Sequence, residues 1–357
     1  MPPPLSLTPP GRTVVAAVLL AVAAALAVAG CGSHHRRAAV PAQPEEVRTV
    51  AAHSECPGTG SPARGYSWPL LPAHEEHPIR GTFGEPRMII RSLATTPPTG
   101  SAQFHQGVDI VGRVGYRVFA VTGGIVESVT SDRVVVRQDE HRVFQYYYVR
   151  SALHAGQHVR AGRTVIGRIK PEARHVHLTE IVDGRAVNPL LHLHPYDDRV
   201  PPTVRTVRFV GPGGAPEQAG DLHGEVEVIA QADDAQTGDV HGPLHGMPVA
   251  PALVEWRLVA AGGRTVVKRT VVADFRHHIP RPHRFWQVYA PETRQNFPVI
   301  EKRFHYGQPG RYDYVLSHAL HTGRLHDGRY VLEVTAADEC GNTAVLREPV
   351  VVRRAGV

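Results

Sequence analysis

Two short histidine-bearing segments carry the residue types that bind and use a metal ion. His105 and Asp109 stand four positions apart, and His175 and His177 stand two apart. On extended backbone, side chains at even spacing point to the same face, so each pair can present its groups together. Imidazoles and carboxylates are typical zinc ligands, and a catalytic zinc keeps three protein ligands and one open position. The two segments therefore predict a zinc hydrolase.

A second copy of the same spacing weakens the bare pattern. The chain has 23 histidines in 357 residues, and His192, His194 and Asp198 repeat both spacings within one proline-bearing segment. Short patterns of this kind arise by accident. The copy would draw every ligand from one short loop, whereas the first set lies among strand-like runs separated by glycine. We favour the first set; for each of its residues the alternative is a buried, hydrogen-bonded side chain.

The elements that must position the first set are predicted to be strands. Runs rich in valine, isoleucine and aromatic residues are separated by glycine or aspartate, and no segment has a helical stripe of ten or more residues. An antiparallel all-β domain follows. Its expected strands span residues 117–121, 125–129, 133–137, 143–149, 164–169 and 175–182.

A second β-rich region begins after Pro201 and Pro202. Its ending looks like the last strands of an immunoglobulin-like or fibronectin-like β-sandwich, although the cysteine and tryptophan spacing of a true immunoglobulin domain is missing. The aromatic residues Phe285, Trp286 and Tyr289 either fill its core or form a ligand surface, and we favour the core. The expected strands span residues 203–210, 224–230, 253–259, 265–272, 330–336 and 344–352.

The first 31 residues indicate export. Arg12 is the only charge before an apolar run that ends in a small residue followed by Cys31. This ending looks like a lipoprotein signal, in which the cysteine carries the lipid, and an uncleaved membrane anchor is the alternative. Residues 32–65 are polar and irregular, which predicts a flexible linker. Both interpretations place the two domains, 66–196 and 197–357, outside the cytoplasm.

Cysteine usage and charge agree with export. Beyond Cys31 only Cys56 and Cys340 remain, so we expect a disulfide between them, with two unpaired thiols as the alternative. The net charge of +6 predicts attraction to anionic lipids and acidic wall polymers. The arginines are dispersed, without a basic helix or an aromatic-basic motif, so we do not expect nucleic acid as a partner.

Seven landmarks follow one another in order within residues 66–196. They are Trp68-Pro69, Phe83-Gly84-Glu85-Pro86-Arg87, His105 with Gly107 and Asp109, the run from Gly115 to Val126, the turn from Gly156 to Gly162, His175 with His177, and Val187-Asn188-Pro189. This succession resembles the lysostaphin and LytM-type zinc endopeptidases, which cut peptide bonds of bacterial peptidoglycan. The resemblance covers a little over a third of the chain and implies a curved sheet with a groove across one face.

The resemblance also implies a role for each candidate residue. His105, Asp109 and His177 would bind Zn²⁺. His175 would take a proton from the attacking water and return it to the leaving amine.

One position departs from the family pattern. Tyr148 stands where the family carries a histidine that stabilises the oxyanion. A phenol can donate one hydrogen bond but cannot become a cation near neutral pH, and losing one oxyanion donor lowers the rate by about a hundred- to a thousandfold. His154 and His158 are near enough in sequence to replace that histidine, but they match loop and turn positions.

Two functions remain open from the sequence. The first is a lipid-anchored zinc endopeptidase that hydrolyses peptide bonds of peptidoglycan cross-links, with its activity impaired at Tyr148. The second is a catalytically inactive module that keeps the zinc site and binds wall peptides or docks a partner wall hydrolase. We favour the peptidase, because a protein that never needed catalysis would have little use for His175 beside an intact ligand set.

Overall fold

The computed structural model describes residues 44–49, 56, 65–92, 99–235, 245–296 and 308–353. The expected signal segment with Cys31, and most of the expected linker, lie outside these residues. Among the described elements, strands predominate, and the helices are short 3₁₀ turns and the four-residue α1 (Phe285–Val288). This confirms the all-β prediction. No described helix has both the length and the apolar character needed to cross a membrane.

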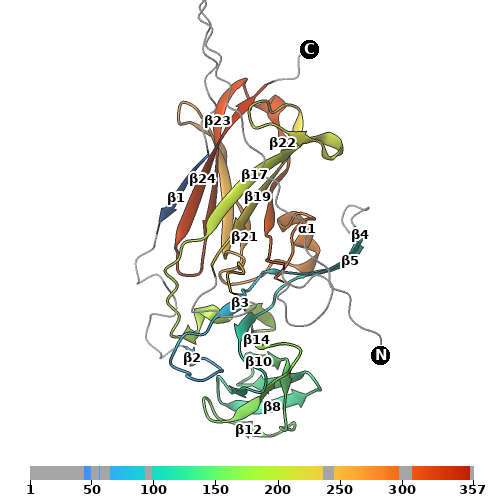
Figure 1. Ribbon diagram of the computed structural model, residues 1–357, viewed down its shortest axis with the longest axis vertical. Coiled ribbons are helices and arrows are strands. Elements are labelled where there is room, and N and C mark those ends of the chain that lie inside the picture. The colour runs from blue at the N-terminus through green and yellow to red at the C-terminus, as the bar shows by residue number, and fades with distance from the viewer. Residues whose placement is uncertain are drawn as a thin grey trace, which may run out of the picture. The chain divides into compact units, whose positions relative to one another are not determined.

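The first region, residues 65–200, is built on an eight-stranded sheet (Figure 1). Its strand order is β12-β8-β9-β10-β14-β6-β3, and β15 also pairs with β14. A smaller sheet, β11-β13-β7, shares its core, and β4 pairs with β5. The bounds are β2 Tyr66–Ser67, β3 Ile79–Gly81, β4 Pro86–Ser92, β5 Thr99–Phe104, β6 Val108–Val111, β7 Arg117–Phe119, β8 Gly124–Val129, β9 Arg133–Arg137, β10 Arg142–Tyr147, β11 Val149–Arg150, β12 His158–Val159, β13 Val165–Ile169, β14 His175–Val182, β15 Arg185–Val187 and β16 Leu193–His194.

Side chains along β10 point alternately to two faces of the sheet, one packed in the core and the other carrying the candidate site. Phe144 and Tyr146 are fully buried, whereas Gln145 and Tyr147 between and beyond them are only half-buried. The Tyr146 hydroxyl accepts a hydrogen bond from the Val121 amide at 2.9 Å, so its polar end is satisfied inside the core. Tyr147 consequently projects from the opposite face, beside the histidines of β14.

The second region, residues 203–353, is a sandwich of two antiparallel sheets. One has the order β18-β17-β19-β22, and the other β1-β24-β23-β20-β21. Buried aliphatic and aromatic side chains of both sheets, such as Val228 and Trp256, form one core between them. The bounds are β1 Glu45–Thr49, β17 Thr203–Val210, β18 Pro216–Glu217, β19 Glu225–Asp233, β20 Leu253–Ala260, β21 Thr265–Asp274, β22 Asp313–His321, β23 Gly328–Ala337 and β24 Thr343–Val352.

Part of the expected linker is a strand of this sandwich. Glu45–Thr49 (β1) pairs antiparallel with β24, beside which it is drawn in Figure 1. All five side chains are exposed, so the sequence has no apolar alternation that would have indicated a strand. Backbone hydrogen bonds to the edge of the sheet hold it, together with a 2.7 Å bond from Arg48 Nη2 to Thr203 Oγ1.

The two regions have separate hydrophobic cores, but the sandwich core includes two residues that precede the boundary expected between residues 196 and 197. Phe83 and Phe104, from the first region, are buried in the sandwich core against Phe275. Gly84 has a φ of +83°, and a Cβ there would lie 2.2 Å from the ring of Phe275, so only glycine fits this close approach. The Tyr289 hydroxyl donates to the Gly84 carbonyl at 3.0 Å.

The aromatic stretch between β21 and β22 fills the core rather than a ligand surface. Phe285 and Tyr289 are buried, and Trp286 packs against the same cluster. The core interpretation of these aromatics is therefore confirmed. The strand β22 that follows was missed by the sequence interpretation, which assigned no element between residues 274 and 325.

Candidate metal centre

The pairing of β6 with β14 places the candidate ligands opposite one another. In this antiparallel register His177 lies across from Asp109, and His175 lies across from Val111. Alternation along β14 then puts His175 and His177 on the same face. His105 approaches from the loop between β5 and β6, four residues before Asp109.

The donor atoms of the predicted ligands meet at one point. His105 Nε2 lies 2.8 Å from His177 Nδ1 and 3.2 Å from Asp109 Oδ1, and His177 Nδ1 lies 3.1 Å from the same oxygen. His175 Nε2 is also close, at 3.4 Å from Asp109 Oδ1. His105, Asp109 and His177 form a group that could hold a metal ion.

The far nitrogen of each imidazole is hydrogen-bonded to the protein. His105 Nδ1 lies 2.7 Å from the Thr82 carbonyl, and His175 Nδ1 lies 2.7 Å from the Ala173 carbonyl. Because a carbonyl can only accept, these shorter contacts favour the tautomer in which Nδ1 carries the proton and Nε2 points a lone pair at the centre. A guanidinium nitrogen also lies near each Nδ1, that of Arg87 at 3.0 Å from His105 and that of Arg80 at 3.4 Å from His175. His177 Nε2 bonds to Thr179 Oγ1 at 2.7 Å, which leaves its Nδ1 for the centre.

Asp109 is held as a carboxylate by its surroundings. Arg87 Nη2 donates to Asp109 Oδ2 at 2.8 Å, while the other carboxylate oxygen, Oδ1, lies near the imidazoles. Burial alone would raise the pKa of Asp109, but His105, His175 and Arg87 outweigh it and hold that pKa well below its usual range. Burial, together with Arg87, lowers the pKa of His105 to about 3. A neutral imidazole beside an ionised carboxylate is the protonation state that metal binding requires.

His175 differs from the other two histidines in its neighbours. Burial and the nearby Arg80 guanidinium lower its pKa, and Asp109 partly offsets them. The ring of Tyr148 packs edge-on against it, with the ring centroids 4.7 Å apart. A neutral His175 can accept a proton at Nε2, the atom that faces the centre.

A pocket of about 300 Å³ opens over this group. Tyr147 and Tyr148 form part of its wall, and Tyr147 packs edge-on against His177. Burial is the main cause that raises the pKa of Tyr148, and the nearby Asp109 charge raises it further, so the hydroxyl stays protonated near neutral pH. The pocket is lined by Arg87, Gln103, Phe104, His105, Gln106, Asp109, Tyr147, Tyr148, His177 and Thr179.

The other histidine candidates are not brought to this pocket. His192 bonds to Glu180 Oε2 at 2.8 Å, and His192, His194 and Asp198 together do not form one of the groups within the described residues whose ligand atoms meet, so the second copy of the spacing does not assemble a ligand set. His158 lies on β12, at the far edge of the sheet from β14. His154 precedes that strand and is absent from the pocket lining.

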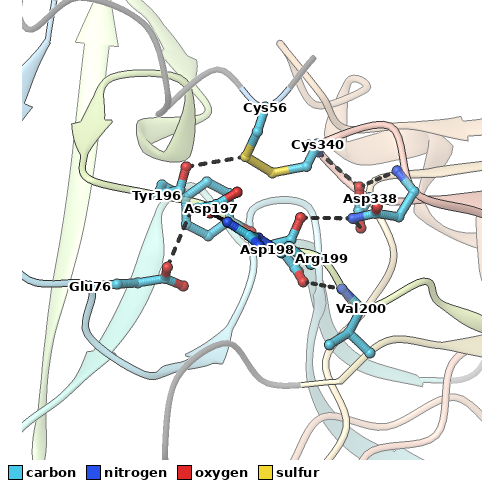
Figure 2. The surroundings of a disulfide bond; sticks show 10 residues. Cys56, Glu76, Tyr196, Asp197, Asp198, Arg199, Val200, Asp338 and Cys340 are labelled. Atoms are coloured by element: carbon cyan, nitrogen blue, oxygen red, sulfur yellow. Dashed lines mark hydrogen bonds and ion pairs between the residues drawn. A yellow bond between two sulfur atoms is a disulfide. The ribbon is translucent and has the colours of Figure 1, made fainter. Parts of the chain in front are cut away.

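Cys56, within the expected linker, forms a disulfide with Cys340, in the turn between β23 and β24 (Figure 2). Beside it lie Asp198 and Asp338, which with Asp234 form a second group of buried acidic residues whose carboxylate oxygens lie within 4.8 Å of one another. Burial raises the pKa of Asp198 and of Asp338 to about 7.

Several residues of the metal centre had no role assigned from the sequence. Arg87 appeared only as part of a landmark, and Glu85, which lies 3.4 Å from it, was likewise unassigned. The landmark itself was the available signal for both. Tyr312 donates to Glu85 Oε1 at 2.7 Å from 227 residues away, and no sequence pattern connects the two.

No protein family model matches this sequence, and neither does any curated protein. Among solved structures, the SpoIIQ–SpoIIIAH pore-forming complex is 19% identical with a TM-score of 0.29, over 37% of this chain and 92% of that chain. A zinc-containing peptidase from Vibrio cholerae is 20% identical with a TM-score of 0.28, over 36% of this chain and 40% of that chain. Csd3 from Helicobacter pylori is 20% identical with a TM-score of 0.25, over 38% of each chain. Such low TM-scores assign neither family nor activity to this chain.

Proposed function

We propose that this chain is a zinc endopeptidase that hydrolyses peptide bonds of peptidoglycan cross-links. The observation that carries the proposal is the convergence of His105 Nε2, Asp109 Oδ1 and His177 Nδ1, with His175 Nε2 beside them. The cross-link as substrate comes from the resemblance of the sequence landmarks to the lysostaphin and LytM-type enzymes.

The donor set fits zinc. In a tetrahedral site with bonds of about 2.0–2.1 Å, neighbouring ligand atoms lie about 3.3 Å apart. The three donor atoms here are separated by 2.8, 3.1 and 3.2 Å. Hydrogen bonds to the far nitrogens orient the ligating histidines in the way that zinc sites require. His105, Asp109 and His177 would hold the ion, which when bound would polarise the scissile carbonyl and acidify a water.

His175 supplies the proton transfers in this proposal. Its Nε2 carries a lone pair towards the centre, because Nδ1 donates to the Ala173 carbonyl. It can therefore accept the proton of the attacking water at Nε2 and deliver it to the leaving amine. The burial and the Arg80 charge that lower its pKa keep it in the accepting form before the reaction.

Tyr148, whose ring packs edge-on against His175 and which lines the pocket, can serve the oxyanion. Its protonated hydroxyl can donate one hydrogen bond, without the positive charge of a histidine. We therefore expect cleavage slower than that of an enzyme with histidine at this position.

The same position supports the second candidate function. Tyr148 packs on His175, and the pocket lining includes Gln103 and Gln106, whose amide groups can form hydrogen bonds with a peptide backbone. A chain that binds zinc and wall peptides without cutting them, or that docks a partner wall hydrolase, would retain the same centre.

Digestion of purified peptidoglycan separates the two functions. The zinc-loaded chain is incubated with the polymer, and the released fragments are identified by mass spectrometry, with and without a chelator. New amino and carboxyl ends that disappear with the chelator and return with added zinc support the peptidase. Peptide binding without any new ends supports the inactive module.

We further propose that the chain acts at the outer face of a membrane, anchored by lipid on Cys31 and facing the cell wall. The support is the apolar run that ends before Cys31. Cys31→Ala should release the chain from the membrane fraction of expressing cells, and retention of this variant in that fraction would contradict the anchor.

A further inference from the structure

Two hydrogen bonds and one ion pair form a chain of contacts from the sandwich to the candidate metal centre. The Tyr312 hydroxyl, in the sandwich, donates to Glu85 Oε1 at 2.7 Å. That same oxygen lies 3.4 Å from Arg87 Nη1, and Arg87 Nη2 donates to Asp109 Oδ2 at 2.8 Å. Asp109 then turns its other oxygen, Oδ1, to the imidazoles. One side chain of the sandwich is thus three contacts away from the ligand atom of Asp109.

Each member of this chain is largely withdrawn from water. Tyr312 is 0% exposed, Glu85 1% and Asp109 3%. The second Glu85 oxygen, Oε2, accepts the Thr82 amide at 3.0 Å, so the carboxylate is held at both ends. Thr82 is the residue whose carbonyl fixes His105. The orientation of Glu85 therefore bears on two candidate ligands, through Arg87 on one side and Thr82 on the other.

A buried carboxylate that loses a donor becomes less stable as an anion. Burial raises the pKa of Glu85, and Arg87 and the Tyr312 hydroxyl counteract that rise. Without the Tyr312 hydroxyl, no hydrogen bond from that residue holds the Glu85 carboxylate in place next to Arg87. The Arg87 guanidinium, which forms the bond that turns Asp109 Oδ1 towards the histidines, then has a weaker anchor.

We infer that Tyr312 is a positioning residue of the metal centre and that the sandwich is a structural support of that centre rather than a separate attached module. This inference rests on the proposed binding of zinc by His105, Asp109 and His177. It does not require that the chain cut peptidoglycan.

The test is the zinc affinity of the full chain, measured by competition with a chromogenic chelator. Tyr312→Phe removes only the hydroxyl and should weaken zinc binding about tenfold, since partners behind a ligand typically contribute ten- to a hundredfold in metal affinity. Tyr330→Phe is the matched control. It removes another buried hydroxyl of the sandwich, which donates to the His326 carbonyl at 2.7 Å, and it should leave zinc affinity unchanged.

A double-mutant cycle separates positioning from a general loss of stability. If Tyr312 acts through Glu85, Tyr312→Phe should change zinc affinity by less than about twofold in a Glu85→Gln background. A full tenfold loss in that background, or equal affinities for Tyr312→Phe and Tyr330→Phe, overturns the inference while leaving the proposed zinc site intact. Weakened binding in Tyr312→Phe alone supports it even if the wild-type chain cuts no peptide bond. A wild-type chain that binds no zinc overturns both proposals.

Discussion

Two largely buried groups of acidic and metal-ligating side chains lie within the described residues, and they differ in the charges around them. At the His105–Asp109–His177 group, Arg87 and the imidazoles hold the pKa of the carboxyl well below its usual range. At the Asp198–Asp234–Asp338 group, burial and neighbouring carboxylates raise the pKa values instead. Convergence alone therefore does not define a reactive centre. The first group has the ionised carboxylate that a bound cation needs, whereas the carboxyls of the second group, next to a disulfide, have pKa values raised towards neutrality.

This difference predicts that substitutions at the first group alter the rate of cleavage, whereas substitutions at the second group alter the free energy of unfolding.

The largest effect is expected for His175→Ala, because a positioned general base contributes about a hundred- to ten-thousandfold to rate. Cleavage of peptidoglycan should fall by that factor, while zinc content and thermal stability stay close to wild type. His192→Ala is the matched control, because this histidine bonds to Glu180 away from the pocket. Unaltered cleavage by His175→Ala would remove His175 from the mechanism.

The next largest effect is an increase in the rate of cleavage. Tyr148→His restores an ionisable donor at the oxyanion position, and cleavage should rise by up to about a hundred- to a thousandfold. The rate is measured as new amino groups released from purified peptidoglycan per unit time. Tyr116→His, at an exposed position, controls for the addition of a histidine. If Tyr148→His and the wild type are both inactive with zinc bound, the inactive-module interpretation is favoured.

Beside the second group, loss of the disulfide should lower the free energy of unfolding. Cys340→Ser removes the disulfide to Cys56, and disulfides typically contribute about 2–4 kcal/mol. The free energy of unfolding, from denaturant titration, should fall by that amount, with zinc stoichiometry unchanged. Cys56→Ser should give the same loss, because either change breaks the same bond. Wild-type stability in both variants would contradict the structural role.

The smallest effect concerns pH. Burial raises the pKa of Asp198 to about 7, against about 3.9 in an unfolded chain. Between these values the folded chain binds more protons than the unfolded chain, so stability falls as pH rises from about 4 to about 7. Asp198→Asn removes this titration and should recover about 1–2 kcal/mol at pH 8 relative to pH 5. The acidic groups that contribute to this slope or face it are Glu76, Asp197, Asp234, Asp338 and Glu339.

Denaturant titrations of the wild type and Asp198→Asn at both pH values provide the measurement. Asp221→Asn, at an exposed position outside this group, is the control and should leave the wild-type slope unchanged. Equal slopes for the wild type and Asp198→Asn would mean that Asp198 is ionised in the folded chain throughout this range.

Local patterns in the sequence predicted the strands and the faces they present. The expected strands at 133–137, 175–182 and 203–210 coincide with β9, β14 and β17, because each is a β-branched or aromatic run between turn residues. Strand alternation placed His175 and His177 on one face. The exposed β1 was missed because no side chain of it enters a core, so its sequence carries no apolar period.

The residues that support the candidate metal centre are brought to it by contacts between distant parts of the sequence, and local patterns could not predict them. The bond between Tyr312 and Glu85 spans 227 residues, and Thr82 acts through its backbone carbonyl, which any residue type would supply. The sequence also could not predict that Phe83 and Phe104 pack into the sandwich core, because an apolar residue carries no sign of which region's core will bury it.

The central claim is that one zinc ion is held by His105, Asp109 and His177. Native mass spectrometry of the full chain, with zinc supplied at equal concentration, tests it most directly. One zinc is predicted in the wild type and in His192→Ala, which alters the second copy of the histidine spacing, and none in His177→Ala. Equal zinc content in the wild type and His177→Ala, or no zinc in any of the three, would contradict the claim.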